Sequence, residues 1–534
     1  MSHQKKVLLI GIDGATYHML TPLIDAGKLP AFQKLMQTGS YGNLQSPILA
    51  SSPVGWTSMM TGVNPGRHNI YDYYNGFNGT YQRPFASSSD VRSEQLWRVI
   101  GRFGLRSIVM NVPMTFPPDP LRGILISGLP FHNKKRFTFP SYLTSELIQQ
   151  EYITDFFNIC SPSLTEYLAT AQKTMMKRQQ IFKDLLHKNE WSLGIVNFTT
   201  LDRLQSLFWN ENEIIQRFYQ LMDKLLGELI DAYGEGIQTL VVSPYGYKAV
   251  KKKFFVNEWL WEHELLARSV STEQASIPNF YNDYFAQGNG NGRWITSFLA
   301  NSHITKDNLR AFIPDAFCEL AKKFTPATFR KMFPRENLII HWERTKAYFP
   351  SYLMPGINLN LKGREPQGIV EPGAEYENLR NLIIRELYRL KDPCTFENVI
   401  AHVYRKEEIF SGDCLEHAPD IVFVPHRHDY YLDPNKRTIR HCVGYANDDY
   451  PVHACRTPHG VVLITGPDVK ENYHIPEFNA MDIAPTVLHM LDLPVPEKMD
   501  GIIRNDIFQH PTVPVRRSVQ YKYQVDNTQE MAIR

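Results

Sequence analysis

The stretch Val7-Leu8-Leu9-Ile10, closed by Gly11 and followed by Asp13, decides the fold of this chain. It is short, wholly apolar and stopped by a glycine, which predicts a buried strand rather than the core of a signal peptide. Similar β-branched runs recur along the chain, bounded by Gly, Pro or Asp. They are Arg106–Asn111, Gly194–Phe198, Leu240–Ser243, Asp420–Val424 and Val461–Thr465.

Segments with helical periodicity lie between these runs, and clear examples are Ser163–Leu186 and Glu211–Tyr233. This alternation predicts an α/β fold, in which a doubly wound, mainly parallel sheet is sandwiched by helices. Ligands of such sheets bind beyond the carboxyl ends of the strands. The first candidates for a site are therefore the side chains that follow the predicted strands. They are Asp13, Asp202, Pro244, Tyr245 and the segment around Cys455.

The bulk composition is that of an ordinary globular protein. The chain has 534 residues, of which 43% are hydrophobic and 21% charged, with a formal net charge of +2. Since 57 basic residues are balanced by 55 acidic ones, we expect no nucleic-acid partner. The six cysteines lie far apart, which argues against a disulfide framework and favours a reducing compartment. No run of about 18 apolar residues occurs, so we expect a cytoplasmic protein without a membrane partner.

The pattern changes once along the chain, and this predicts the domain organisation. We expect an N-terminal part of the core over residues 1–250 and a C-terminal part over residues 349–508. Residues 251–348 are rich in aromatic and polar side chains and contain a soft Gly-Asn turn at Gln287–Gly292, which predicts an inserted cap. Residues 509–534 are polar and contain proline, so they are expected to form a tail.

Four sets of segments, spread over nearly the whole chain, carry the pattern of a known family. They are Val7–Ala15; Ser52–Gly62 with Asn64–His68; Lys362–Gly373 with Ala418–Pro425; and Gly460–Pro467 with Asp482–Thr486 and Leu493–Pro496. Together they resemble the alkaline phosphatase superfamily, nearest its type I phosphodiesterase/nucleotide pyrophosphatase branch. The resemblance implies the doubly wound fold, places Asp13 at a metal-binding Asp of the family and places Ser52 at the position of its nucleophilic Thr or Ser.

The resemblance also implies a centre of two divalent cations, commonly zinc, which clamp the attacking and leaving oxygens of a phosphoryl transfer. Most of its ligands differ here. The family's Ser-Asp-His-Gly turn reads Ser243–Gly246, with Pro244 and Tyr245 in the middle. In the Asp-Arg-x-x-His-x-Phe-Trp pattern, Asp202 remains and Ser206 replaces the His.

The last ligand of the family is a His shortly before the final core strand. Counting back from Gly460 places Arg456 at this position, with Cys455 beside it. We therefore expect no cofactor. The alternative is one weakly bound divalent metal, held with the help of His453 or His459.

Loss of two dications would leave the carboxylates of Asp13 and Asp202 facing each other uncompensated. The pKa of one of them should rise unless a cation takes the vacated space, and Arg456 is the predicted cation. Tyr245 adds a phenolic donor. The expected catalytic set is Ser52, Asp13, Asp202, Tyr245 and Arg456, and the expected substrate-binding set is Asn64, Arg67, His453 and His459.

Two other residues have a structural interpretation beside a functional one. His68 belongs to a Pro-Gly-x-His turn, where a satisfied structural histidine is the more common finding. Cys455 has no assured base beside it, so a buried, inert thiol is expected rather than a nucleophile.

Three classes of function follow from these residues. The preferred hypothesis is an enzyme repurposed for metal-independent chemistry on a small anionic substrate, as in a specialised biosynthetic pathway, because Tyr245 and Arg456 are functional side chains. A second is a metal-dependent phosphodiesterase or phosphatase with non-standard ligands. A third is a non-catalytic protein that binds a ligand or a partner chain.

Overall fold

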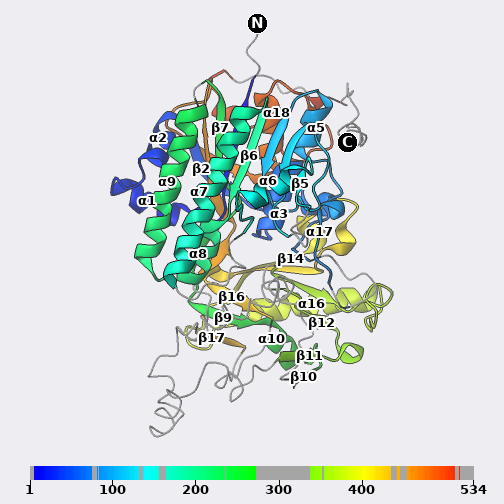
Figure 1. Ribbon diagram of the computed structural model, residues 1–534. Coiled ribbons are helices and arrows are strands. Elements are labelled where there is room, and N and C mark those ends of the chain that lie inside the picture. The colour runs from blue at the N-terminus through cyan, green and yellow to red at the C-terminus, as the bar shows by residue number, and fades with distance from the viewer. Residues whose placement is uncertain are drawn as a thin grey trace.

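The chain forms a large unit around a nine-stranded sheet and a smaller unit of short sheets that lies below it in Figure 1. This computed structural model describes residues 5–74, 81, 83–130, 136–155, 164–234, 236–271, 337–351, 354–434, 442–445, 454–510 and 516–517.

The main sheet has the strand order β20-β2-β19-β7-β1-β6-β3-β4-β5. The central strand β1 pairs in parallel with both β6 and β7, and β3 and β4 extend the parallel part. β19 is antiparallel to β7 and to β2, and β5 is antiparallel to β4. The bounds are β1 Val7–Ile12, β2 Ser40–Gln45, β3 Ser107–Met110, β4 Gly123–Ile126, β5 Thr138–Phe139, β6 Leu193–Phe198, β7 Gln238–Ser243, β19 His459–Thr465 and β20 Tyr473–Asn479.

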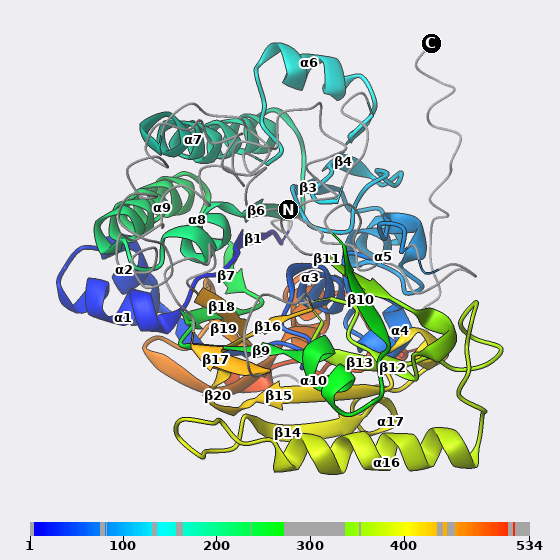
Figure 2. The ribbon, with the colours of Figure 1, turned by 90° about the horizontal axis from the view of Figure 1, so that it is seen from below.

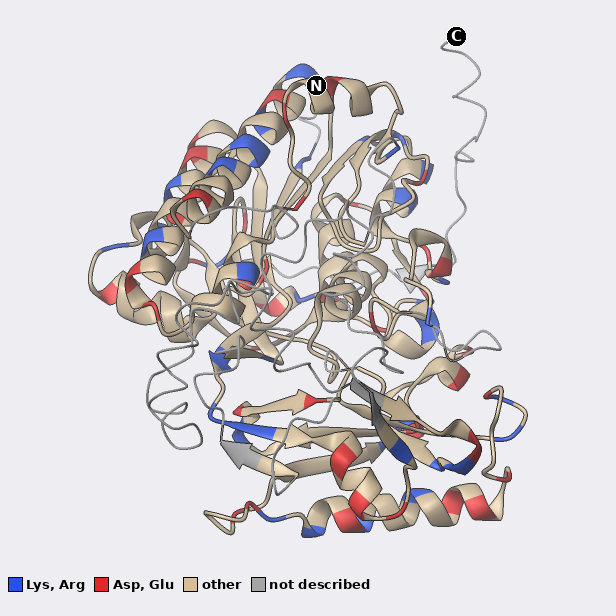
Figure 3. Cartoon of the chain, turned by 60° about the horizontal axis from the view of Figure 1, so that its bottom comes forward, with Lys and Arg blue, Asp and Glu red and all other residues tan. Residues whose placement is uncertain are grey.

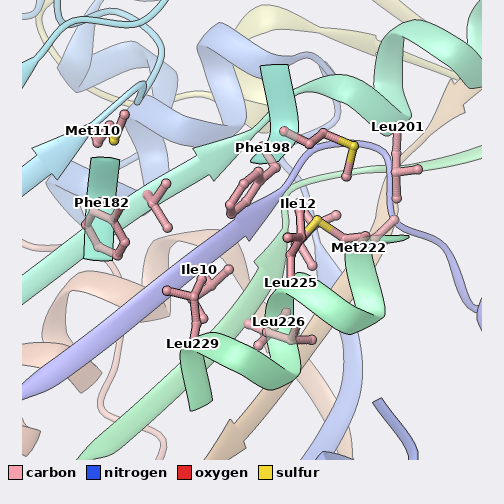
Figure 4. Close-up of a cluster of buried hydrophobic side chains, with 14 of the residues drawn as sticks. Ile10, Ile12, Met110, Phe182, Phe198, Leu201, Met222, Leu225, Leu226 and Leu229 are labelled. Atoms are coloured by element: carbon pink, nitrogen blue, oxygen red, sulfur yellow. The ribbon is translucent and has the colours of Figure 1, made fainter. Parts of the chain in front are cut away.

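Each face of the main sheet is covered by helices, so successive side chains of the central strands enter two different cores. Ile10 and Ile12 of β1 join one core together with Phe182, while Leu9 joins the other with Trp56. Figure 4 shows the first core, in which side chains of β1 and β6 meet those of the long helices. Its helices are α1 Tyr17–Asp25, α2 Pro30–Thr38, α6 Leu143–Gln149, α7 Leu164–Lys188, α8 Thr200–Phe208 and α9 Asn212–Tyr233; those of the second core are α3 Ser52–Thr61, α5 Leu96–Arg102 and α18 Ile483–Met490.

The predicted doubly wound α/β class is confirmed, and so are the predicted strands of the main sheet and the two long helices. One predicted strand belongs elsewhere. The run Asp420–Val424 forms β15 (Ile421–Pro425), which pairs in an antiparallel manner in a separate sheet of the smaller unit. Its side chains are nearly all buried, as in the main sheet, so its hydrophobic content did not distinguish the two locations.

The smaller unit is built from short sheets that share one hydrophobic core. A four-stranded sheet has the order β12-β13-β15-β14, and a three-stranded sheet has the order β16-β9-β17. Helix α16 (Ala374–Arg389) packs along β14 on the outer side of this unit (Figure 2). The remaining bounds are β8 Gly246–Ala249, β9 Lys252–Phe255, β10 Arg268–Ser271, β11 Asn337–Ile340, β12 Ala347–Tyr348, β13 Gly356–Leu359, β14 Ile400–Arg405, β16 Tyr430–Asp433, β17 Val443–Tyr445, β18 Ala454–Thr457, α4 Pro65–His68, α10 Val256–Glu262 and α17 Lys406–Ile409.

The domain division stays a prediction, because residues 272–336 of the expected cap lie outside the described part of the chain. Phe254 and Trp259 of the expected cap share their core with Ile383 and Phe423, so the expected boundary at residue 348 runs through this core. In the expected tail, Arg516–Arg517 form β22, which pairs with β21 (Val495–Pro496).

Acidic and basic residues are interspersed along the helices drawn in Figure 3. Within the described ranges, none of the helices has the length and apolar character that crossing a membrane demands.

Candidate active site

The candidate site lies where the chain leaves the central strands of the main sheet. Asp13 directly follows β1, Asp202 lies in the first turn of α8 after β6, and Tyr245 follows β7. Ser52 is the first residue of α3, and Arg456 lies on β18. Because β6 and β7 both run parallel to β1, their carboxyl ends reach the same edge of the sheet. The side chains therefore converge there, as expected for a doubly wound fold.

Ser52 and Trp56 hold the Asp13 carboxylate from the same face of α3, since they are four residues apart. Ser52 Oγ donates to Asp13 Oδ2 at 2.8 Å, and Trp56 Nε1 donates to Oδ1 at 2.7 Å. Burial raises the pKa of Asp13, and the negative charge of Asp202 raises it further. A buried carboxylate of raised pKa, hydrogen-bonded to a hydroxyl, is suited to accept the proton of that hydroxyl.

Close packing of Trp56 over β1 is possible because Gly11 has no side chain. A Cβ at Gly11 would lie 2.3 Å from Trp56 Cζ2 and 2.8 Å from Asn197 Oδ1. Gly55 in α3 likewise allows Pro244 to pack closely against the helix, since a Cβ at Gly55 would lie 2.6 Å from Pro244 Cβ. The two glycines thus bring α3, with Ser52 at its N-terminus, against the strand ends.

Asp202 lies at the centre of a second, cationic part of the site. Arg456 donates to Oδ1 through Nε at 3.1 Å and through Nη2 at 2.9 Å, and Arg203 donates to Oδ2. The phenols of Tyr245 and Tyr247 donate to Oδ1 at 3.0 Å and 2.6 Å. Burial alone would raise the pKa of Asp202, but the two guanidinium groups outweigh it and hold this pKa below its usual range.

Short β-pairing explains how Arg456 reaches Asp202. β18 pairs with β8, and Arg456 lies opposite Tyr247 in this pair. The guanidinium carbon of Arg456 lies 4.9 Å from the centre of the Tyr245 ring, in cation–π contact. On the far side, Arg203 Nη2 binds Asp155 Oδ2 at 3.0 Å, so charges of alternating sign follow one another across the site.

The structure brings Arg456 to Asp202, while the exchange of a metal ligand for a guanidinium stays a prediction. Arg456 pairs with Asp202, whose pKa is lowered, while the charge of Arg203 offsets the burial of Asp13 only in part and the pKa of Asp13 is raised. Ser206 does not aim at the carboxylates, because its Oγ donates to the Arg203 carbonyl oxygen at 2.9 Å.

The donor set does not fit the centre of two cations that the family implies. Both oxygens of Asp202 are engaged by guanidinium and phenol donors, so a dication would have to displace Arg456. Over the described ranges, no three His, Cys, Asp or Glu side chains gather closely enough to hold a metal ion. Such a centre needs several of these ligands for each cation.

Three of the four residues expected to bind substrate, Asn64, Arg67 and His459, make none of the hydrogen bonds of this cluster within the described part of the chain. Asn64 caps α4, accepting from Gly66 N at 2.9 Å and donating to Asp500 at 2.8 Å, and Arg67 pairs with Asp500 at the surface. His459 is exposed at the start of β19, and His453 lies outside the described residues. The role of these residues in binding substrate stays a prediction.

His68 is fully buried, as expected for a structural histidine, whereas Cys455, which was expected to be buried, is half-buried. Ile70 N donates to His68 Nδ1 at 3.1 Å, so Nε2 carries the hydrogen and donates to Ser58 Oγ at 2.9 Å. Burial lowers the pKa of His68 to about 3. The Cys455 thiol donates to the His428 carbonyl oxygen at 3.1 Å, and burial raises its pKa to about 12, so it is no ready nucleophile.

Sequence reasoning missed five side chains of the site: Trp56, Tyr73, Asp155, Arg203 and Tyr247. Two of them left a local signal. Arg203 directly follows Asp202, and Tyr247 lies two residues after Tyr245. Tyr73 and Asp155 left none, because they reach the site only through tertiary packing.

Comparison with known proteins places the chain in a family. The model of the type I phosphodiesterase / nucleotide pyrophosphatase family matches residues 7–450, and the chain belongs to this family. It is thereby a member of the alkaline phosphatase superfamily. No curated protein matches the sequence.

Solved structures share the fold at low sequence identity. Phosphonoacetate hydrolase from Sinorhizobium meliloti 1021, in complex with phosphonoformate, is 13% identical with a TM-score of 0.53, and the match covers 92% of this chain and 95% of the hydrolase. Murine ectonucleotide pyrophosphatase / phosphodiesterase 5, in complex with AMP, is 13% identical with a TM-score of 0.49, covering 95% of this chain and all of that one.

Proposed function

We propose that this chain is an enzyme that transfers a group from a small anionic substrate through Ser52, without the two cations of its family. The observation that carries the proposal is the hydrogen bond of 2.8 Å from Ser52 Oγ to the buried Asp13 carboxylate. In this proposal, Ser52 attacks the electrophilic centre of the substrate and its proton passes to Asp13. Ser52 is also the first residue of α3, and the positive end of the helix dipole favours a developing alkoxide there.

The cationic part of the site supports the same proposal. Arg456 and Arg203 are permanently charged and are fixed by Asp202, so they provide preorganised positive potential where the family uses metal charge. The phosphonoacetate hydrolase that shares the fold was solved with phosphonoformate, a small anion. We extend a small anionic substrate to this chain as part of the proposal.

The test compares the purified wild type with Ser52→Ala on a phosphodiester, bis(p-nitrophenyl) phosphate, and on a carboxylic ester, p-nitrophenyl acetate. We expect turnover of at least one of them, reduced at least about 100-fold by Ser52→Ala, and unchanged by a chelator. Ser51→Ala is the matched control. The Ser51 side chain is equally buried one residue earlier and caps no backbone group, so its removal should leave turnover intact.

Three results would contradict the proposal. Turnover that a chelator abolishes and zinc or manganese restores would return the protein to metal-dependent phosphoester chemistry. Turnover that survives in Ser52→Ala would remove the nucleophile. Tight binding of small anions without turnover of either ester would identify a non-catalytic binding protein.

A further inference from the structure

A groove runs along the outer side of the large unit, between the long helices α7 and α9. The two helices lie side by side over the main sheet, as Figures 1 and 2 show. The groove has a volume of about 760 Å³ and is lined from positions 165 to 180 of α7 and from 217 to 228 of α9. At about 1.5 Å per residue, it extends for roughly 22 Å, or about four helical turns.

The floor of the groove is apolar and only partly covered. Leu225 is buried there, and Leu168 and Leu221 are half-buried against the core beneath the helices. Met176 also lines the groove and is 47% exposed. A flexible methionine beside partly exposed leucines is an apolar surface suited to contact with a partner.

Side chains of α7 and α9 hold the two walls together. Gln179 Nε2 donates to the Leu225 carbonyl oxygen at 3.2 Å and to Glu228 Oε2 at 2.8 Å. Arg217 Nη2 donates to Gln172 Oε1 at 2.7 Å. The groove is therefore formed before a partner binds, and a preorganised surface loses little conformational entropy on binding.

The rims of the groove are cationic. Among the described residues, four basic side chains line it against one acidic side chain, a net charge of +3, although the whole chain carries only +2. Of the four, Lys177 and Lys224 form no ion pair with a described residue, so their charges are open to a partner. The five charged residues are Lys173 and Lys177 of α7, and Arg217, Lys224 and Glu228 of α9.

We propose that this groove is the docking site for an acidic amphipathic helix of a partner protein. The apolar face of that helix would pack on Met176 and Leu221, and its carboxylates would meet the basic side chains of the two rims. A helix laid between two neighbouring helices buries one apolar stripe, with anchors at i, i+3, i+4 and i+7. Complementary charge speeds the association of such a helix and selects against basic partners.

The shape and the charge of the groove favour this occupant over two others. A bilayer surface is flat, so it would meet the rim lysines without reaching Leu225 at the floor. A second copy of this chain, docked symmetrically through the same groove, would bring two cationic linings together, and like charges across an interface are unfavourable.

The test measures the binding of a fluorescent synthetic peptide to the full chain by anisotropy. The probe is a helix of about 18 residues with Leu along one face and Glu along the other, and the comparison peptide has Lys at every Glu position. We expect the acidic peptide to bind at least about tenfold more tightly than the basic one. Met176→Ser should weaken the acidic peptide at least about threefold, because it removes an exposed apolar anchor.

Charge reversal at the two rims provides the matched comparison. Lys177→Glu combined with Lys224→Glu should weaken binding of the acidic peptide at least about tenfold. Arg385→Glu combined with Arg389→Glu makes the same change in net charge on α16 of the smaller unit, where these side chains are exposed. This control should weaken binding less than about threefold, since it leaves the groove unchanged.

Hydrogen exchange provides a measurement that does not depend on a variant. The bound acidic peptide should slow amide exchange in α7 and α9 of the wild type. Protection confined to other elements would overturn the proposal, as would absence of peptide binding, equal affinity for both peptides or an equal loss in the two double variants. Binding to phosphatidylglycerol vesicles but not to the acidic peptide would overturn it as well and identify a lipid surface as the partner.

Discussion

Arg456→Met is the substitution that tests most directly whether a guanidinium stabilises the carboxylate at the family's metal position. Methionine keeps much of the side-chain length of Arg456, but removes the charge, the cation–π contact with Tyr245 and the hydrogen bonds to Asp202. The side chain of Asp202 is 1% exposed, and it would then keep only Arg203 of the two guanidinium groups that pair with it.

The expected cost can be bounded from the contacts. Removing one partner of a buried ion pair costs about 3–5 kcal/mol, because a charge remains buried without compensation. Asp202 would still be bound by Arg203, Tyr245 and Tyr247, so its charge stays partly compensated and the loss should lie at or below the lower end of this scale. We expect Arg456→Met to lower the free energy of unfolding by about 2–3 kcal/mol at pH 7.

Urea denaturation at pH 7 measures this loss, and a double-mutant cycle with Asp202→Asn isolates the pair. The cycle should give a coupling free energy of at least about 1.5 kcal/mol, since the neutral amide introduced by Asp202→Asn no longer needs the cation. Arg389→Met is the control for losing an exposed arginine: the Arg389 side chain, paired with Glu386, is 67% exposed, so less than about 1 kcal/mol is expected. A coupling below about 0.5 kcal/mol would refute the view that Arg456 compensates Asp202.

Two further changes test the packing and the protonation that hold α3 at the strand ends. Gly11→Ala should lower the free energy of unfolding by about 1–3 kcal/mol and reduce Ser52-dependent turnover, because the new Cβ would lie 2.3 Å from Trp56. Gly227→Ala in α9 is the control, since the nearest neighbour of its Cβ would lie at 3.4 Å. This control should raise the free energy of unfolding by about 0.5–1 kcal/mol in the same denaturation assay. His68 has its pKa lowered from 6.5 to about 3 by burial, so the unfolded chain binds its proton first as pH falls. The free energy of unfolding of the wild type, relative to that of His68→Gln, should therefore fall by up to about 1.4 kcal/mol per pH unit below pH 6.5. If the difference between the two free energies of unfolding did not change between pH 7 and pH 5, His68 would not be neutral in the folded protein.

Much of the site could be found from sequence because its chemistry is placed by short, local patterns. Asp13 was found because it follows a buried strand, and Ser52 because its segment resembles the nucleophile segment of the family. The position of Arg456 followed from the length of the loop before Gly460, and its contact with Asp202 agrees with that count. In each case the signal lies within a few residues of the functional side chain.

The remaining residues could not be found this way, since they depend on contacts between distant parts of the chain. Tyr73 is buried near the charged groups of the site, and the residue before it, Asp72, is held by Arg83 and by Ser351 of the smaller unit. Asn64, by contrast, lies in a matching motif but has its side chain bound by Gly66 and Asp500.

The sequence by itself determined the strands, the long helices, the doubly wound class and the identity of the two facing carboxylates. These depend on hydrophobic periodicity and on chain direction, both of which are local properties. Only the tertiary structure decided that β15 belongs to a separate sheet and that Asp202 rather than Asp13 receives the guanidinium groups. Strand pairing and charge compensation each require two partners, and which partners meet is set by the packing of segments far apart in the chain.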